Sequence, residues 1–146
     1  MSKIENAVSM FGEGFVCSQA LLATYGTQFG LDREIALKAA AAFVGGMARM
    51  GETCGAVTGA FMLIGLKHGN VKPDDKEARR KTYEVAREFV NKFESRHGSV
   101  KCKDLIGWDI NTKEGYDAAK EKKLFETVCP RYVEDAAMII EQILGH

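Results

Sequence analysis

The stretch GGMARMGETCGAVTGAFMLIGL, from Gly45 to Leu66, is apolar enough for a core helix, yet it contains six glycines and one cysteine. Each glycine in a helix interior costs about 1 kcal/mol relative to alanine, so its repeated use needs a reason. The pattern predicts a helix over about 53–67, in which Gly55 and Gly59 share one face without side chains. We expect another part of the protein, or a cofactor, to pack on this face at near-backbone distance.

The rest of the chain is helical in pattern nearly throughout, with no strand-like alternation, repeat or linker. Polar capping residues, among them Ser2 with Glu5 in a capping box and Asp32, precede several segments whose apolar residues recur at helical spacing. Further helices are predicted at about 2–11, 15–28, 33–43, 75–97, 99–109, 111–128 and 129–144, of which 99–109 is one or two turns and 111–128 is the least regular. We therefore predict an all-α fold, a single compact domain over residues 1–146 with six to seven helices.

The longest predicted helix, over 75–97, follows Pro73 and carries two specific expectations. Asp74 is expected to cap it, with Glu77 completing a capping box. An apolar stripe at helical spacing, from Tyr83 to Phe93, is expected to face the core.

Charge and hydropathy narrow the class of protein. The 20 basic and 20 acidic residues cancel, which gives no electrostatic argument for binding nucleic acid or an anionic membrane. No apolar run reaches the ~18 to 20 residues of a membrane span. The N-terminal residues MSKIENAVSM do not resemble a secretion signal. We expect a cytoplasmic protein without a nucleic-acid partner.

The four cysteines are the residues best suited to chemistry. In a reducing cytosol stable disulfides are rare, so this number of cysteines indicates metal binding or redox chemistry. Cys17, Cys54, Cys102 and Cys129 all fall near predicted helix N-termini, where unpaired N–H groups and the helix dipole stabilise thiolates. We expect Cys54 to be the most reactive thiol, with a lowered pKa. The alternative is that all four are buried, inert apolar residues.

Spacing shows that any such site must be assembled from separate helices. Successive cysteines are separated by 36, 47 and 26 residues, and there is no C-x-x-C motif. We expect the four thiols to come together in the fold, at least as two pairs.

The segment CGAVTG, Cys54 to Gly59, resembles the C-G-A-x-x-G motif of the prokaryotic C_GCAxxG_C_C family, which is named for redox activity. That family has about this length and four characteristic cysteines: one before the motif, one within it and two after it. Cys17, Cys54, Cys102 and Cys129 match this order, and the segment GFVCSQALL around Cys17 is also similar to the family. The resemblance covers nearly the whole chain and implies a redox role.

Three hypotheses therefore stay open. In the first, the four cysteines cycle between dithiol and disulfide, or hold an iron–sulfur cluster that transfers electrons. In the second, the protein is a helical interaction module in which the four cysteines hold a structural zinc ion. In the third, it is a helical partner protein with inert cysteines. A redox partner protein and a homo-oligomer are both compatible with the sequence.

Overall fold

The structure is a computed structural model that describes residues 1–145. It contains α-helices and short 3-10 segments, and no strand occurs among these residues. The helices are α1 (Lys3–Gly12), α2 (Cys17–Gly26), α3 (Arg33–Ala40), α4 (Gly55–His68), α5 (Lys76–His97), α6 (Cys102–Ile106), α7 (Lys113–Glu121), α8 (Leu124–Thr127) and α9 (Cys129–Leu144), and the 3-10 segments are Thr27–Phe29 and Ala41–Phe43. The predicted all-α class is confirmed.

The predicted number of six to seven helices is slightly too low. The segment expected to form one charged helix over 111–128 forms two, α7 and α8, because Lys123 adopts a left-handed backbone conformation with φ of 57°. The short segment around Cys102 also forms a separate helix, α6, of five residues.

Local sequence sets most helix starts. The Ser2 hydroxyl accepts a hydrogen bond from the Glu5 backbone N–H and so caps α1, as the capping box predicts. The prediction that Asp74 caps α5 is wrong by one residue: the Asp75 carboxylate accepts from the Ala78 N–H at 3.1 Å. The helix begins at Lys76, which places Ala78 at the third helical position, where an N-cap side chain bonds.

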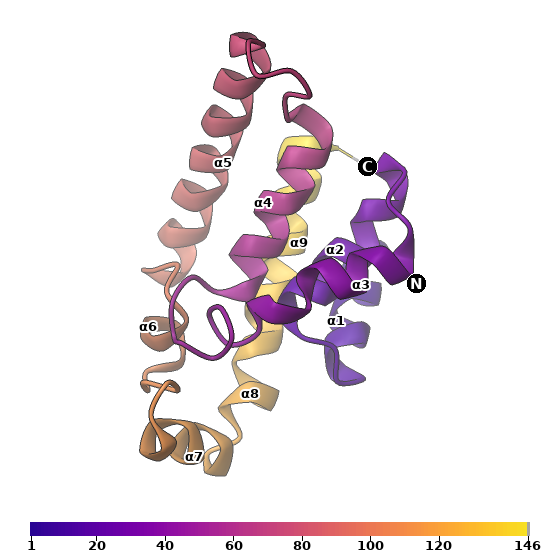
Figure 1. Cartoon of the computed structure of the whole chain (residues 1–146). Coiled ribbons are helices and arrows are strands. Elements are labelled where there is room, and N and C mark those ends of the chain that lie inside the picture. The colour runs from indigo at the N-terminus through magenta and orange to yellow at the C-terminus, as the bar shows by residue number, and fades with distance from the viewer. Residues whose placement is uncertain (146) are drawn as a thin grey trace.

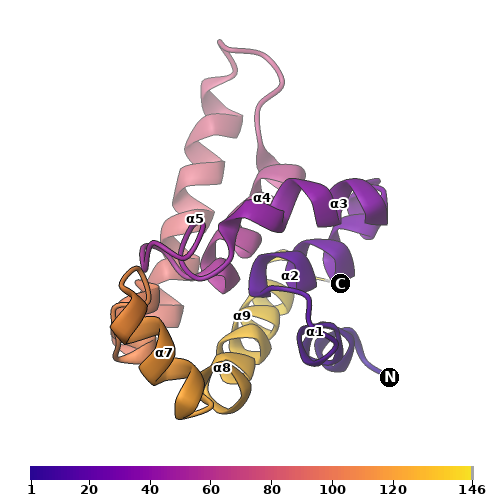
Figure 2. The ribbon, with the colours of Figure 1, turned by 60° about the horizontal axis from the view of Figure 1, so that its bottom comes forward.

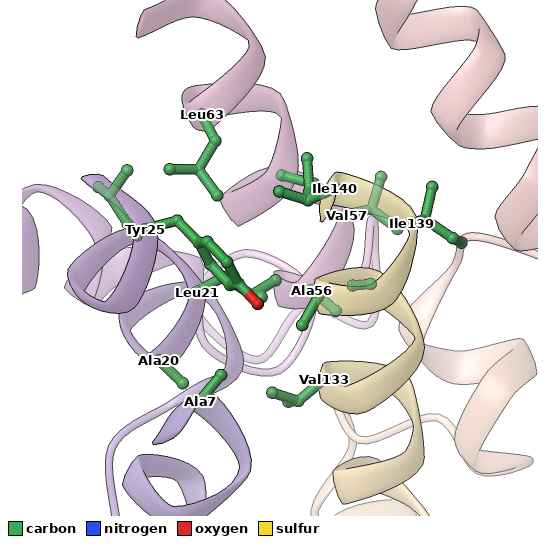
Figure 3. Packing of buried hydrophobic residues seen from close by; sticks show 14 of the residues in the cluster. Ala7, Ala20, Leu21, Tyr25, Ala56, Val57, Leu63, Val133, Ile139 and Ile140 are labelled. Atoms are coloured by element: carbon green, nitrogen blue, oxygen red, sulfur yellow. The ribbon is translucent and has the colours of Figure 1, made fainter. Parts of the chain in front are cut away.

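The main core lies between α2, α4 and α9 (Figure 1). Figure 3 shows side chains from the three helices meeting there, with Leu21 and Tyr25 on α2, Leu63 on α4 and Ile140 on α9. These side chains are fully buried. The Tyr25 hydroxyl donates a 2.6 Å hydrogen bond to the Glu141 carboxylate, which satisfies the one polar atom that this ring brings into the core.

The long helix α5 packs against α4 and α9 through Val85, Phe89 and Phe93. The expectation that Tyr83 belongs to the buried stripe is wrong, because its side chain is 57% exposed. Val85 takes the inward position on this turn, since it lies four residues before Phe89.

A second, smaller apolar cluster occupies the end of the molecule formed by α6, α7, α8 and the start of α9. It contains Cys102, Ile106, Ile110, Ala119 and Cys129. The loop between α3 and α4 reaches this end and lies beside α6 in both views (Figures 1 and 2). No described helix combines the length and the apolar character needed to cross a membrane.

Candidate functional site

All four cysteines stand at helix starts, as the sequence indicates. Cys17, Cys102 and Cys129 are the first residues of α2, α6 and α9, and Cys54 is the N-cap of α4. All four line one cavity of about 530 Å³, and all are free thiols. The fold thus brings together four residues spread over more than a hundred positions of sequence.

The bare face of α4 explains how Cys17 and Cys54 become neighbours. A Cβ atom on Gly55 would lie 3.2 Å from the Cys17 Cβ, and one on Gly59 would lie 3.1 Å from the Ser18 Cα. The first turn of α2 therefore packs directly on the two glycines. Gly59 is covered by this turn, whereas Gly55 also borders the cavity. A cofactor-binding role for Gly55 remains a prediction.

Ser18 holds this close approach in place. Its side chain is fully buried, and its hydroxyl donates a 2.8 Å hydrogen bond to the Ala40 carbonyl at the end of α3. The first turn of α2 is thus fixed from two sides, by α3 and by α4.

Alanine at Gly59 is expected to lower stability, although alanine is the better helix former. Its Cβ would press on the Ser18 backbone, which α3 prevents from moving away. The matched control is Gly65→Ala in the same helix, where nothing lies within 4 Å and stability should rise by about 0.5–1 kcal/mol. Thermal melts measure both. If the two substitutions stabilise the protein equally, the close approach of Ser18 to Gly59 does not affect stability.

The Cys17–Cys54 pair is electrostatically asymmetric. The Cys17 thiol donates a hydrogen bond to the Cys54 sulfur, and the backbone N–H groups of Ala56 and Val57 point to the same atom, so the pKa of Cys54 is lowered despite burial. The same hydrogen bond, burial and the negative charge on Cys54 raise the pKa of Cys17. Within the pair, Cys54 is therefore the thiol that ionises first, and Cys17 retains its proton longer.

Cys102 and Cys129 are held in the protonated form. Burial, assisted by the nearby charge on Cys54, raises the pKa of each to about 12. The two thiols are therefore neutral near pH 7, and Cys54 is the one cysteine of the four whose ionisation the protein favours.

These raised pKa values predict a loss of stability in alkali. Between pH 9 and pH 12 the folded protein retains protons on Cys102 and Cys129 that the unfolded chain releases, so the free energy of unfolding falls as pH rises. Each thiol contributes a slope of about 1.4 kcal/mol per pH unit. Urea unfolding across this range should show a shallower decline for Cys129→Ala than for the wild type. An unchanged slope in the variant would contradict the assignment.

An unusual loop connects the two halves of the site. Five consecutive residues, Gly45 to Arg49, have positive φ angles between 53° and 71° and form a left-handed turn. Three of them are not glycine, and each such residue costs about 1–2 kcal/mol. Backbone hydrogen bonds hold the turn, including a 2.7 Å bond from the Arg49 N–H to the Val44 carbonyl. The sequence predicts a helix over 33–43 that stops before Gly45 and Gly46, and it does not indicate this turn.

The end of this loop is fastened to the start of α6. The Cys54 N–H donates to the Val100 carbonyl at 2.8 Å, and the Cys102 N–H donates to the Glu52 carbonyl at 2.6 Å. A Cβ on Gly46 would lie 2.7 Å from the Cys102 Cβ, so the loop backbone also touches this cysteine directly. These contacts fix Cys102 relative to Cys54.

The cavity around the thiols is mostly apolar. Aromatic side chains contribute much of its wall, namely Phe11, Phe15, Tyr116, Phe125 and Tyr132. Arg49 and Glu126 are the charged side chains among the lining residues, apart from the thiols themselves. The guanidinium of Arg49 lies over the Tyr116 ring, 4.7 Å from its centroid. The sequence does not identify any of these residues as part of a site, because their side chains come together only in the tertiary fold.

The described arrangement does not fit a metal centre. An iron–sulfur cluster or a structural zinc ion takes four closely grouped ligands. Within residues 1–145, no group of three or more histidine, cysteine, aspartate or glutamate side chains is placed so that it could hold a metal ion. The four thiols share a cavity without forming a ligand cage.

Comparison with known protein families agrees with the cysteine pattern. A family model described as "Putative redox-active protein (C_GCAxxG_C_C)" matches residues 15–143, which include all four cysteines. Neither the curated proteins nor the solved structures yielded a match. The family match covers most of the chain. The protein therefore belongs to the C_GCAxxG_C_C family of redox-active proteins.

Proposed function

We propose that the protein carries out thiol–disulfide exchange, with Cys54 as the attacking thiolate and Cys17 as the resolving thiol. The observation that carries this proposal is the hydrogen bond from the Cys17 thiol to a Cys54 sulfur whose pKa is lowered at the start of α4. A low-pKa thiolate next to a second thiol is the arrangement that exchange requires.

The proposed reaction takes two steps and balances in atoms and electrons. The Cys54 thiolate attacks one sulfur of an organic disulfide, forms a mixed disulfide and releases the first thiolate. Cys17 then loses its proton and attacks the Cys54 sulfur, which forms the Cys17–Cys54 disulfide and releases the second thiolate. The organic disulfide gains two electrons and becomes two thiolates, the protein loses two electrons, and the single proton from Cys17 passes to one of the released thiolates. A dithiol reductant reverses the sequence.

Cys102 and Cys129 are assigned to a second thiol couple in the same cavity. Their burial and raised pKa values make them poor first nucleophiles, but either can attack a disulfide once its proton is removed. This couple would return the Cys17–Cys54 disulfide to the dithiol form and become a disulfide in its place. A reducing cytoplasm is the setting we propose for this chemistry.

Redox titration with differential alkylation tests the proposal. The protein is equilibrated in buffers of oxidised and reduced dithiothreitol, quenched in acid and alkylated, and its disulfides are located by mass spectrometry. We expect a reversible Cys17–Cys54 disulfide, which is absent in both Cys54→Ser and Cys17→Ser. Failure of Cys17 and Cys54 to pair at any potential would reject the mechanism.

Metal ligation by all four cysteines is the second candidate function. The observation in its favour is that the four thiols line one cavity. The observation against it is that, within residues 1–145, no three such side chains are placed to hold a metal ion. Anaerobic purification followed by elemental analysis separates the two candidates. Stoichiometric iron or zinc, lost in Cys102→Ser without loss of folding, would favour ligation over exchange.

A further inference from the structure

Access to the thiols limits the size of any disulfide that can react with them. Cys54, Cys102 and Cys129 are only 5–7% exposed, and the cavity is the space that all four share. A surface disulfide of a folded protein is poorly shaped to reach thiols at the base of a cavity, whereas a volume of about 530 Å³ falls in the range of small-molecule sites. Access to the thiols therefore favours a disulfide that belongs to a small molecule.

The walls of the cavity indicate the chemistry of that molecule. Its aromatic and aliphatic lining favours an apolar body. Arg49 is the single cationic side chain in the lining. Its guanidinium is positioned by the Tyr116 ring and by the left-handed turn, and it makes no ion pair within residues 1–145. A planar guanidinium whose face is stacked keeps its N–H edge available for a carboxylate.

Glu126 is the other charged group in the wall, and it argues less strongly for a ligand. It lies on α8, a single turn of helix, and both Glu126 and Arg49 are exposed to solvent. The difference is that the Tyr116 ring holds the Arg49 guanidinium, whereas within residues 1–145 no ring or cation holds Glu126. Because Arg49 is held in place and Glu126 is not, the cavity favours an anionic ligand over a cationic one.

We propose that the cavity binds a small organic disulfide with an apolar body and a carboxylate, which Arg49 holds while the disulfide reacts with Cys54. This inference rests on the proposed thiol–disulfide exchange. Arg49 is then a binding residue that selects the substrate. The reaction itself is the exchange described above, with the two small thiols as products.

Three small disulfides that differ mainly in charge test the inference. They are 3,3′-dithiodipropionate, which is anionic, bis(2-hydroxyethyl) disulfide, which is neutral, and cystamine, which is cationic. The rate of mixed-disulfide formation at Cys54 is followed by mass spectrometry at low salt. Each rate is divided by the rate with iodoacetamide, which corrects for any change in the ionisation of Cys54.

The wild type should react with the anionic disulfide about tenfold faster than with the neutral one. Arg49→Gln should remove this preference by lowering the rate with the anionic disulfide, whereas Arg49→Lys should retain part of the preference. Lys81→Gln is the matched control, because it removes an exposed cation from α5, outside the cavity lining. It should retain the full preference.

The outcomes distinguish a failure of the proposed role of Arg49 from a failure of the proposed thiol–disulfide exchange. Equal rates for the three disulfides in the wild type, or a preference for cystamine that Glu126→Gln abolishes, would overturn the role of Arg49 and leave exchange at Cys54 intact. The wild-type comparison does not depend on whether the Arg49 variants fold. If iodoacetamide modifies Cys54 and none of the three disulfides does, thiol–disulfide exchange itself is rejected.

Discussion

Replacing Cys54 with serine should lower the rate of alkylation of the folded protein by iodoacetamide at pH 7 by at least about thirtyfold. Among the thiols that remain, Cys102 and Cys129 have pKa values of about 12, and burial still raises the pKa of Cys17 once Cys54 is absent, whereas the pKa of Cys54 lies below the ordinary 9.0. At pH 7 a thiol with a pKa of 12 has about a thousandth of the thiolate fraction of a thiol with a pKa of 9. A more basic thiolate is also a better nucleophile, which offsets about half of this difference on a logarithmic scale. The net reduction in rate is therefore about thirtyfold.

Cys17→Ala is the informative comparison for this experiment. It retains Cys54 but removes the thiol that donates to it, so the pKa of Cys54 should rise and the pH–rate profile should move to higher pH. Cys17→Ser keeps a hydroxyl donor and should move the profile less. Stopped alkylation with peptide mapping assigns each rate to its residue. If Cys54→Ser alkylates as fast as the wild type, another thiol is the reactive one.

A large loss of stability, about 3 kcal/mol or more, is expected for Gly46→Ala. An added Cβ would lie 2.6 Å from both the N and the O atoms of Glu52 and 2.7 Å from the Cys102 Cβ. The φ angle of +71° adds the ordinary cost of a left-handed residue, about 1–2 kcal/mol. Relief of these contacts requires the loop to separate from α6, which also displaces Cys102.

Gly30→Ala separates the two causes. Gly30 has a φ of +85° but nothing within 4 Å of the added Cβ, so it reports the backbone cost alone, about 1 kcal/mol. For a chain of this size the melting temperature should fall by about 10 °C for Gly46→Ala and by a few degrees for Gly30→Ala. Equal losses in the two variants would mean that the contact between the loop and α6 contributes nothing.

The parts of the structure that the sequence predicted are those determined locally. Ser2 and Asp32 cap helices as expected, because the bond from an N-cap side chain spans only three residues. The helix starts at the cysteines were also predicted from local signals, such as Pro130 directly after Cys129. The one-residue error at Asp74 arises because two adjacent aspartates offer equivalent caps, and only the packing of α5 selects between them.

The parts that it missed depend on contacts between distant segments. Nothing in the local pattern around Met47, Ala48 and Arg49 favours a left-handed backbone, and propensity argues against it. The turn exists because the loop must join α3 to α4 while its backbone bonds to Val100 and Cys102. The residues of the cavity wall therefore cannot be predicted from each segment separately. The cation among them, Arg49, is identified only from the folded structure.

The pairing of α1 with α9 bears on how quickly the site forms. These two helices, near opposite ends of the described chain, lie in contact, whereas most helical proteins of this size fold through local contacts. The α2–α4 crossing that joins Cys17 to Cys54 needs only residues 1–68. A nascent chain can therefore bring Cys17 and Cys54 together early, whereas Cys129 and the complete cavity wall form only after α9 has been synthesised. During that interval the thiolate is open to solvent and to any oxidant.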